Sequence, residues 1–259
     1  MNNLLKIILI TLLLALSACS SESEQQKVDR LNQEQLQQEL KNFENGDTNA
    51  SAKIAYIYAE AFYDYPHAIE WYKKAIDLKI QNAGFNLAML YKKKLHDYKN
   101  AVIYYKKDIE LGNSRAAYNL AYLYDETLHD FENARIWYEK AYEMGDKDAA
   151  FNLGYIYEDL KDYENAHNWY EKAYKMGHKG GAFNLGLMYY NQNDHQKAME
   201  WYKKASELKC KDATFNVANM YRHELKDYDK ALEWYKKAAD MGDLGGKKFY
   251  LELKEKGHL

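Results

Sequence analysis

The residues of this sequence that could recognise another molecule recur at nearly constant intervals. One column holds asparagine in most of its copies, which are separated by 33, 33, 33, 32 and 32 residues. A side-chain amide both donates and accepts hydrogen bonds, so the column could bind the backbone of an extended partner chain. It could equally join adjacent helices of its own fold. The column consists of Lys53, Asn86, Asn119, Asn152, Asn184 and Asn216.

A second column lies three residues further along and is mostly aromatic or large and apolar. Aromatic side chains give a large contact area with few rotamers to immobilise, which suits partner recognition. We interpret this column as a binding surface, whereas the residues just before each asparagine are expected to pack between neighbouring repeats. The binding column is Tyr56, Met89, Tyr122, Tyr155, Leu187 and Asn219. The packing column is Ala52, Phe85, Tyr118, Phe151, Phe183 and Phe215.

Charged residues that follow the binding column differ from copy to copy. They are basic at Lys92 and Lys93, and basic again at Arg222 and His223. In the middle of the chain they are acidic, which would favour a basic partner segment through steering and specificity. The alternative is that these charges only solvate helix ends. The acidic positions are Asp125, Glu126, Glu158 and Asp159.

The same residue types offer little for catalysis. The eight histidines are dispersed, and no His, Cys and carboxylate cluster has the spacing of metal ligands. Neighbouring carboxylates such as Glu158 and Asp159 diverge on a helix, and no phosphate-binding glycine loop is present. The net charge is −3, with no basic tract longer than 92–94. We therefore predict no enzyme, cofactor, metal or small-molecule substrate, and no nucleic-acid partner.

Turn and cap residues predict the elements that position these columns. Each second helix is expected to start at an aspartate, a favoured N-cap, and to carry an alanine followed three residues later by Trp or Tyr. Glycine ends four of these helices, and Lys79 and Lys209 replace it in the other two. The aspartates are Asp64, Asp97, Asp130, Asp162, Asp194 and Asp227. The alanines are Ala68, Ala101, Ala134, Ala166, Ala198 and Ala231.

A fixed period of this length predicts an all-α solenoid in which each unit is one helical hairpin. We expect six hairpins over residues 46–243, a capping helix at 28–45 and a second capping helix at 244–259. Residues 19–27, rich in Ser, Glu and Gln, are expected to be a flexible tether.

The first residues form a separate segment. An apolar stretch too short to span a bilayer ends in Leu16-Ser17-Ala18-Cys19, which resembles a bacterial lipobox. The resemblance implies a signal peptide at 1–18, lipidation of Cys19, and a lipid-anchored protein in the bacterial envelope, on the periplasmic face of the outer membrane. The membrane would be contacted through this lipid only. Cys210 would then lack a disulfide partner, and we expect its thiol to be partly exposed.

The repeats resemble known families. The segments Asn152-Leu153-Gly154-x-x-Tyr157 and Trp169-Tyr170-x-Lys172-Ala173 are similar to tetratricopeptide repeats, and residues 227–242 are closer to Sel-one-like repeats. The resemblance implies a right-handed α/α superhelix whose concave face binds a protein or peptide. Our main hypothesis is thus a protein–protein interaction scaffold. One alternative is a periplasmic immunity or inhibitor protein that neutralises a toxic enzyme, and another is a cell-wall glycan binder.

Overall fold

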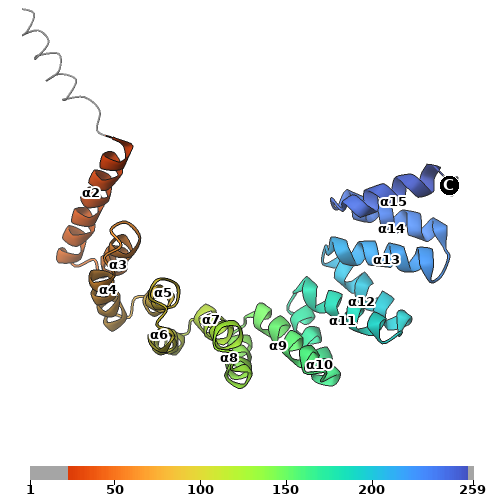
Figure 1. The fold of residues 1–259 in the computed structure, drawn as a ribbon, viewed down its shortest axis with the longest axis horizontal. Coiled ribbons are helices and arrows are strands. Elements are labelled where there is room, and N and C mark those ends of the chain that lie inside the picture. Colours follow the sequence, from red (N-terminus) through yellow and green to blue (C-terminus); the bar gives the residue numbers. More distant parts are fainter. Residues whose placement is uncertain (1–22, 256–259) are drawn as a thin grey trace, which may run out of the picture. The chain divides into compact units, whose positions relative to one another are not determined.

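The computed structural model describes residues 23–255, and every regular element in this range is a helix, with no strand. Fourteen α-helices and two short π-helices follow one another in the order that the hairpin pattern predicts (Figure 1). The chain divides into two compact units, the first ending at Tyr104 and the second beginning at Tyr105. No helix within residues 23–255 is both long and apolar enough to cross a lipid bilayer.

The first unit contains the N-terminal capping helix and the first hairpins. Its elements are α2 (Glu24–Glu44), α3 (Ala50–Glu60), α4 (Tyr65–Asp77), α5 (Ala83–Leu90), η1 (Tyr91–Leu95) and the start of α6 (Tyr98–Glu110). Helix α2 packs on α3, α3 on α4 and α4 on α5.

The second unit continues with the end of α6 and the remaining hairpins. Its elements are α7 (Ser114–Tyr122), η2 (Leu123–Thr127), α8 (Phe131–Glu143), α9 (Lys147–Asp159), α10 (Tyr163–Lys175), α11 (Lys179–Asn191), α12 (His195–Glu207), α13 (Lys211–His223), α14 (Tyr228–Asp240) and α15 (Leu244–Glu255). From α7 onward each α-helix packs against the next, so every hairpin is covered by the following one.

Helix α2 begins earlier than the sequence predicted. Its N-cap is Ser23, whose hydroxyl accepts from the Gln26 backbone at 3.1 Å while the Gln26 side chain accepts from the Ser23 backbone at 2.9 Å. This reciprocal capping box satisfies two backbone donors and starts the helix at Glu24. Residues 24–27, which we had expected to belong to the tether, are therefore helical. Cys19 and the signal segment lie outside the described residues, as do residues 256–259.

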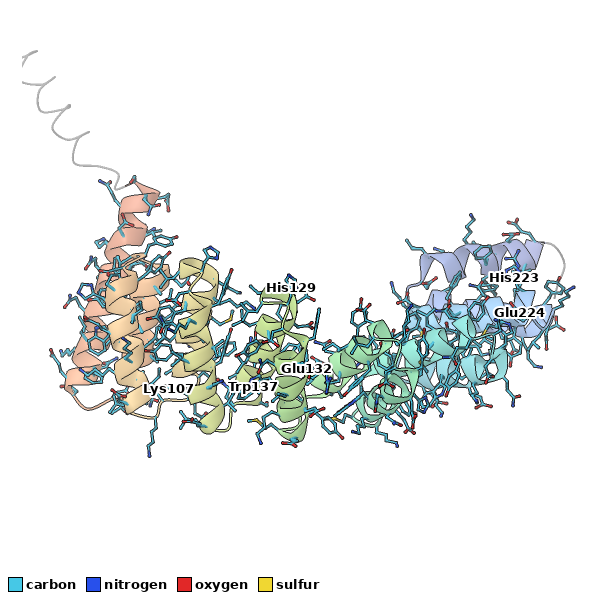
Figure 2. The ribbon with its side chains drawn as sticks, turned by 60° about the horizontal axis from the view of Figure 1, so that its bottom comes forward. Lys107, His129, Glu132, Trp137, His223 and Glu224 are labelled. Atoms are coloured by element: carbon cyan, nitrogen blue, oxygen red, sulfur yellow. The ribbon has the colours of Figure 1, made fainter. Side chains whose placement is uncertain are left out.

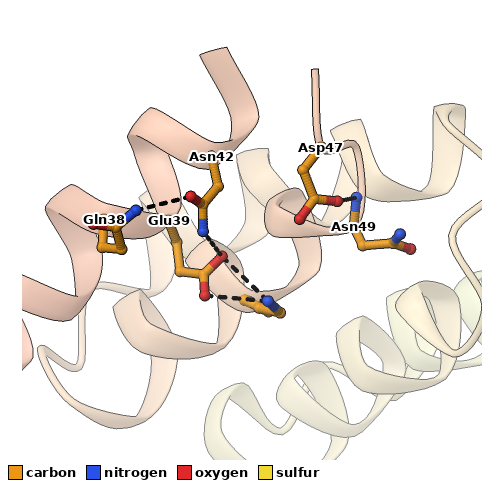
Figure 3. A network of polar contacts seen from close by, with 6 residues as sticks. Gln38, Glu39, Asn42, Asp47 and Asn49 are labelled. Carbon is orange, nitrogen blue, oxygen red and sulfur yellow. Dashed lines mark hydrogen bonds and ion pairs between the residues drawn. The ribbon is translucent and has the colours of Figure 1, made fainter. Parts of the chain in front are cut away.

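A polar network and an aromatic pair attach α2 to the first hairpin. Glu39 accepts hydrogen bonds from Asn42 at 3.2 Å and from the Lys53 ammonium at 3.2 Å (Figure 3). Phe43 meets the Trp71 ring edge-on, with 5.2 Å between ring centroids. Helix α2 thus buries the first repeat in the way that a capping helix must.

The cap and helix-stop predictions are confirmed. All six predicted aspartates accept a hydrogen bond from the backbone N–H three residues ahead. The glycines that end helices have positive φ, and so do Lys79 and Lys209, both at 58°. All six predicted alanines are completely buried. These features fix where each hairpin turns and how closely its helices approach.

The turn between the two helices exists in a long and a short form. In four hairpins the cap aspartate lies eleven positions after the asparagine column. There the chain makes wide turns, closed by backbone hydrogen bonds to the carbonyl five residues earlier, as from Leu128 N to Leu123 O and from Leu225 N to Met220 O. In the two hairpins with one residue fewer, the turn is closed by backbone hydrogen bonds that span fewer residues, such as the one from Lys161 N to Glu158 O. The extra residue is thus absorbed locally, partly as the π-helices η1 and η2.

The burial of Cys210 differs from what we expected from the sequence. Cys210 was expected to be partly exposed, but only 6% of it is accessible, and it packs within the apolar core of the second unit. It is the N-cap residue of α13. Inertness is typical of a cysteine in such surroundings.

Candidate functional site

The candidate site lies on the face of the first helices in the second unit and is centred on Tyr155. This residue of α9 is 62% exposed, a large fraction for a tyrosine within a packed helical array. It lines two cavities, one of about 250 Å³ towards η2 and one of about 450 Å³ towards α11. An exposed aromatic ring between two hollows is a suitable anchor for a partner chain.

Carboxylates surround this ring. Asp125, Glu126 and Asp159 line the smaller cavity, and Glu158 and Asp159 line the larger one. We call the surface formed by Asp125, Glu126, Tyr155, Glu158 and Asp159 the acidic groove. Within residues 23–255 none of its four carboxylates forms an ion pair, although His129 and Lys161 lie at its edges. Figure 2 shows His129, close to the turn that leads into α8.

Two of the carboxylates are oriented from inside the fold. The hydroxyl of Tyr170 donates to Oε2 of Glu158 at 2.7 Å, and the hydroxyl of Tyr138 donates to Oδ2 of Asp125 at 3.3 Å. Both tyrosines are completely buried. Because each tyrosine is fixed by core packing, the carboxylate that it contacts is held at the surface with little rotamer freedom to lose on binding.

Burial also affects the ionisation of the groove. The pKa of Asp125 is raised, first by its partial burial and then by the neighbouring negative charge of Glu126, while the hydrogen bond from Tyr138 opposes the shift. A cationic partner group would offset both causes, since an opposite charge favours the ionised carboxylate. The groove is therefore an electrostatic environment that a lysine or arginine side chain would stabilise.

The asparagine column serves the fold in the second unit. The Asn152 amide donates to the hydroxyls of Tyr118 at 3.1 Å and Tyr138 at 3.0 Å, both in the preceding repeat. Asn184 donates in the same way to Tyr170 at 3.1 Å. Of the two interpretations left open by the sequence, these contacts favour bridging between adjacent helices over binding of a peptide backbone.

The other members of the asparagine column have their own contacts. Asn216 is hydrogen-bonded to Tyr202, and Asn119 donates to the carbonyl of Arg115 at 2.9 Å. Asn86, in the first unit, is half-buried. The first-unit position Lys53 contacts Glu39 of α2, so it too joins neighbouring elements.

The two aromatic columns differ in exposure at several of their positions. In the packing column, the rings of Phe151, Phe183 and Phe215 lie within 5.6–5.8 Å of a buried tyrosine on a second helix. In the binding column, Tyr122 is 41% exposed and Tyr155 62% exposed. In the first unit, Tyr56 is 59% exposed, whereas Met89 is half-buried.

A column of buried tyrosines escaped the sequence analysis. Each immediately follows the Trp or Tyr that we had taken as the large interlocking residue, and each is between 0 and 3% exposed. The Tyr170 hydroxyl, for example, joins Glu158 of its own repeat to Asn184 of the next. The available signal was the repetition of a second aromatic at the same place in every copy. The column is Tyr72, Tyr105, Tyr138, Tyr170, Tyr202 and Tyr235.

The described residues contain no group of three or more His, Cys, Asp or Glu side chains that could hold a metal ion. The carboxylates of the acidic groove lie along a surface and do not converge on one point. Their arrangement can attract and orient a cationic chain, which is the chemistry of recognition.

Family comparisons agree with the repeat pattern. The Sel1 repeat matches residues 49–79, 114–146 and 211–243, and the Tetratricopeptide repeat matches residues 147–176 and 181–212. Proteins built from such repeats are typically non-enzymatic interaction scaffolds. No curated protein matches the chain in sequence.

Solved structures share the architecture. A protective antigen of uropathogenic Escherichia coli with an SLR fold is 29% identical, with a TM-score of 0.56 over 85% of this chain and 52% of that one. The present chain thus spans about half the length of that antigen. A Sel1 repeat protein from Oxalobacter formigenes is 24% identical, with a TM-score of 0.53 over 75% of this chain and 88% of that one.

A third structure resembles this one in fold alone. It is the C-terminal part of a TPR repeat-containing protein from Cytophaga hutchinsonii, with 17% identity and a TM-score of 0.56 over 86% of this chain and 99% of that one. Together these neighbours place the chain among solenoids of stacked helical hairpins.

Proposed function

We propose that this chain, which belongs to the family of Sel1-like and tetratricopeptide repeat proteins, is an interaction scaffold that binds a basic segment of a partner protein in the acidic groove. One observation carries the proposal: four carboxylates without ion pairs flank the exposed ring of Tyr155 between two cavities. A lysine or arginine would neutralise these charges, and its aliphatic stem would pack on the tyrosine ring.

The charges also predict how the partner is captured. Complementary potentials accelerate encounter and suppress wrong partners more than they increase affinity. Added salt should therefore slow association, because charges at an exposed groove are screened over about 8–10 Å at moderate ionic strength. A hydrophobic contact at Tyr155 would be less affected by salt.

The test reverses two groove charges that have no role in the fold. Glu126 and Asp159 are exposed and make no side-chain hydrogen bond in the described chain, so Glu126→Lys with Asp159→Lys should leave helicity and melting unchanged. Binding of a labelled oligolysine peptide, measured by fluorescence anisotropy, should fall by at least about tenfold.

The matched control places the same charge change outside the groove. Glu207 of α12 and Glu233 of α14 are exposed, and neither lines the cavities at Tyr155. Glu207→Lys with Glu233→Lys changes the net charge equally and should bind nearly as well as the wild type. Equal loss of binding in both double variants would mean that net charge, and not this groove, attracts the peptide.

The location of the protein is a separate proposal, supported by the lipobox-like sequence at Leu16-Ser17-Ala18-Cys19. Lipidation at Cys19 would anchor the scaffold in the bacterial envelope and restrict its partners to envelope proteins. Metabolic labelling with an alkynyl fatty acid should mark the wild type and not Cys19→Ser. Labelling that persists in Cys19→Ser would contradict the proposal.

A further inference from the structure

A third cavity lies on the same face, beyond the acidic groove, and it differs in character. Its volume is about 580 Å³, within the range typical of ligand pockets. Leu187 of α11, Phe215 and Met220 of α13, and Phe249 of α15 supply its apolar walls. Its imidazole and carboxylate groups, His223 and Glu224, lie at the C-terminal end of α13 (Figure 2).

The two asparagines of this cavity are already engaged within the fold. Asn219 accepts a 2.6 Å hydrogen bond from the hydroxyl of Tyr235, and Asn216 is bonded to the hydroxyl of Tyr202. What remains for a ligand is chiefly aromatic and aliphatic surface. Burial of a large apolar side chain there would be favourable, whereas an isolated charge would lose its hydration.

The C-terminal helix α15 forms a fixed wall. The Phe249 ring stacks on Tyr235 with 5.4 Å between centroids, and the Arg222 guanidinium lies 4.8 Å from the Phe249 ring centroid. Arg222 also approaches Glu252 of α15 at 3.6 Å. The helix that the sequence predicts as a solvating cap is therefore also part of a pocket.

The cavity continues the acidic groove along the repeat axis of the second unit. The 450 Å³ cavity lies between α9 and α11, and the apolar cavity lies between α11, α13 and α15. Helix α11 lines both cavities, a helix with its side chains is about 10–12 Å wide, and an extended chain advances about 3.3 Å per residue. About three residues of an extended chain would therefore cover the step from one cavity to the next.

From this continuity we propose that the partner segment carries a large apolar, preferably aromatic, side chain about three residues from a basic one, and that this side chain enters the cavity beside Phe249. The proposal rests on the proposed function, since it takes the same segment further along the same face. Charge would select the segment at the acidic groove, and shape would fix its register at the apolar cavity.

The experiment uses the full chain and short synthetic peptides labelled with fluorescein. The parent peptide has two lysines and one tryptophan separated by two-residue Gly-Ser spacers, and it is made in both sequence orders so that both chain directions along the face are tested. Replacing the tryptophan by alanine should weaken binding of the better order by at least about tenfold. Shortening the spacer before the tryptophan should have a similar effect.

Substitutions in the protein test whether this loss of binding arises at the apolar cavity. Leu187→Ser, at a rim residue that is 38% exposed, should weaken the tryptophan peptide severalfold and leave the alanine peptide unchanged. Leu187→Met keeps the apolar rim and should bind like the wild type. Ile136→Ser is the matched control, because Ile136 is 57% exposed on α8 and lines none of the three cavities.

The outcomes separate the two proposals. If lysine peptides bind through Glu126 and Asp159 but the tryptophan has no effect at any spacing, this inference is wrong and the proposed function stands. If no peptide binds, the proposed function fails first. If the protein dimerises and Leu187→Ser abolishes the dimer, a second copy occupies the cavity, and the inference is likewise overturned.

Discussion

Tyr170, which is completely buried in α10, donates a 2.7 Å hydrogen bond to Glu158 at the edge of the acidic groove. The same hydroxyl accepts a hydrogen bond from Asn184 of the next repeat at 3.1 Å. A single core residue therefore connects a surface carboxylate with the packing of the following hairpin. Any contribution of Glu158 to binding depends on this internal support.

Removal of that hydroxyl should affect stability and binding together. In Tyr170→Phe the Asn184 amide loses its acceptor and Glu158 its donor, so we expect a loss of about 1–2 kcal/mol in the free energy of unfolding. Because Glu158 would then be free to rotate, affinity for a lysine peptide should fall severalfold. Urea denaturation and fluorescence anisotropy measure the two effects.

The control is Tyr202→Phe, at the corresponding position two helices later. Its hydroxyl is bonded to Asn216, and the cavities of the acidic groove do not include it. This variant should lose comparable stability while binding a tryptophan-free lysine peptide normally. Equal binding losses in both variants would show that the effect comes from reduced stability.

Gly154 lies where a larger side chain would clash with the facing helix of its hairpin. A Cβ atom built on Gly154 would lie 2.4 Å from Cδ1 of Tyr170, and one on Gly186 would lie 2.5 Å from Cδ1 of Tyr202. Alanine improves helix propensity by about 1 kcal/mol, but overpacking costs about 1–3 kcal/mol. We expect Gly154→Ala to lower the free energy of unfolding by up to about 2 kcal/mol, as measured by urea denaturation. A gain in stability would mean that the tyrosine ring moves aside freely.

The glycines occur only in the two hairpins with the short turn. The long-turn hairpins have alanine at the equivalent place, namely Ala55, Ala88, Ala121 and Ala218. We infer that the residue missing from the short turn draws the two helices together, so that only glycine fits opposite the tyrosine. Inserting one residue after Asp159 should therefore reduce the cost of Gly154→Ala.

Lys209 occupies a position where the backbone favours glycine. Its φ is 58°, and the other helix ends of this type are mostly glycine. A residue with a Cβ is strained in this region by about 1–2 kcal/mol, whereas glycine is not. Lys209→Gly should raise the free energy of unfolding by up to about 1 kcal/mol, and thermal melting should show a higher midpoint. Gly177→Ala, at φ 80°, is the converse control and should be destabilising.

The cap aspartates predict an acid-sensitive fold. Hydrogen bonds from the residue three positions ahead lower the pKa of all six below the usual 3.8; for Asp162 the Asn165 side chain contributes most. A depressed pKa means that the stabilisation is present above pH 3.8 and is lost as the pH falls through the lower, folded-state pKa. Asp125 and Asp146, with raised pKa values, act in the opposite direction.

Asparagine substitution separates titration from capping. Asparagine is also a good N-cap but does not ionise. Helicity followed by far-UV circular dichroism should therefore fall less steeply with acid in Asp162→Asn with Asp194→Asn than in the wild type. An unchanged acid transition would indicate that other carboxylates control it.

The sequence predicted much of the backbone because turn and cap chemistry is local. Aspartate at the start of a helix and glycine at its end satisfy backbone groups a few residues away, and their positions were therefore readable. The hydrogen bond between Asn152 and Tyr138 was not, because it joins two repeats and depends on how closely they pack. For the same reason the burial of Cys210 could not be inferred from its place after a helix.

The candidate site was predictable only in part. The exposure of Tyr155 and the acidity around it followed from the repeat register, since residues in one column face the same way. The internal support of Glu158 and the apolar cavity beside Phe249 involve side chains from different helices. Their relation depends on packing that a single hairpin does not specify.

The hydrogen bond from asparagine to a tyrosine of the preceding repeat bears on how the number of repeats can change. Because Asn152 and Asn184 donate to the equivalent tyrosines Tyr138 and Tyr170, excision of residues 152–183 would bring Asn184 to Tyr138 with the same hydrogen bond available between the two hairpins. We expect that a whole hairpin can be removed or duplicated at these two junctions with this hydrogen bond kept. The reach of the scaffold, and hence the length of partner that it can accommodate, can change in increments of one repeat.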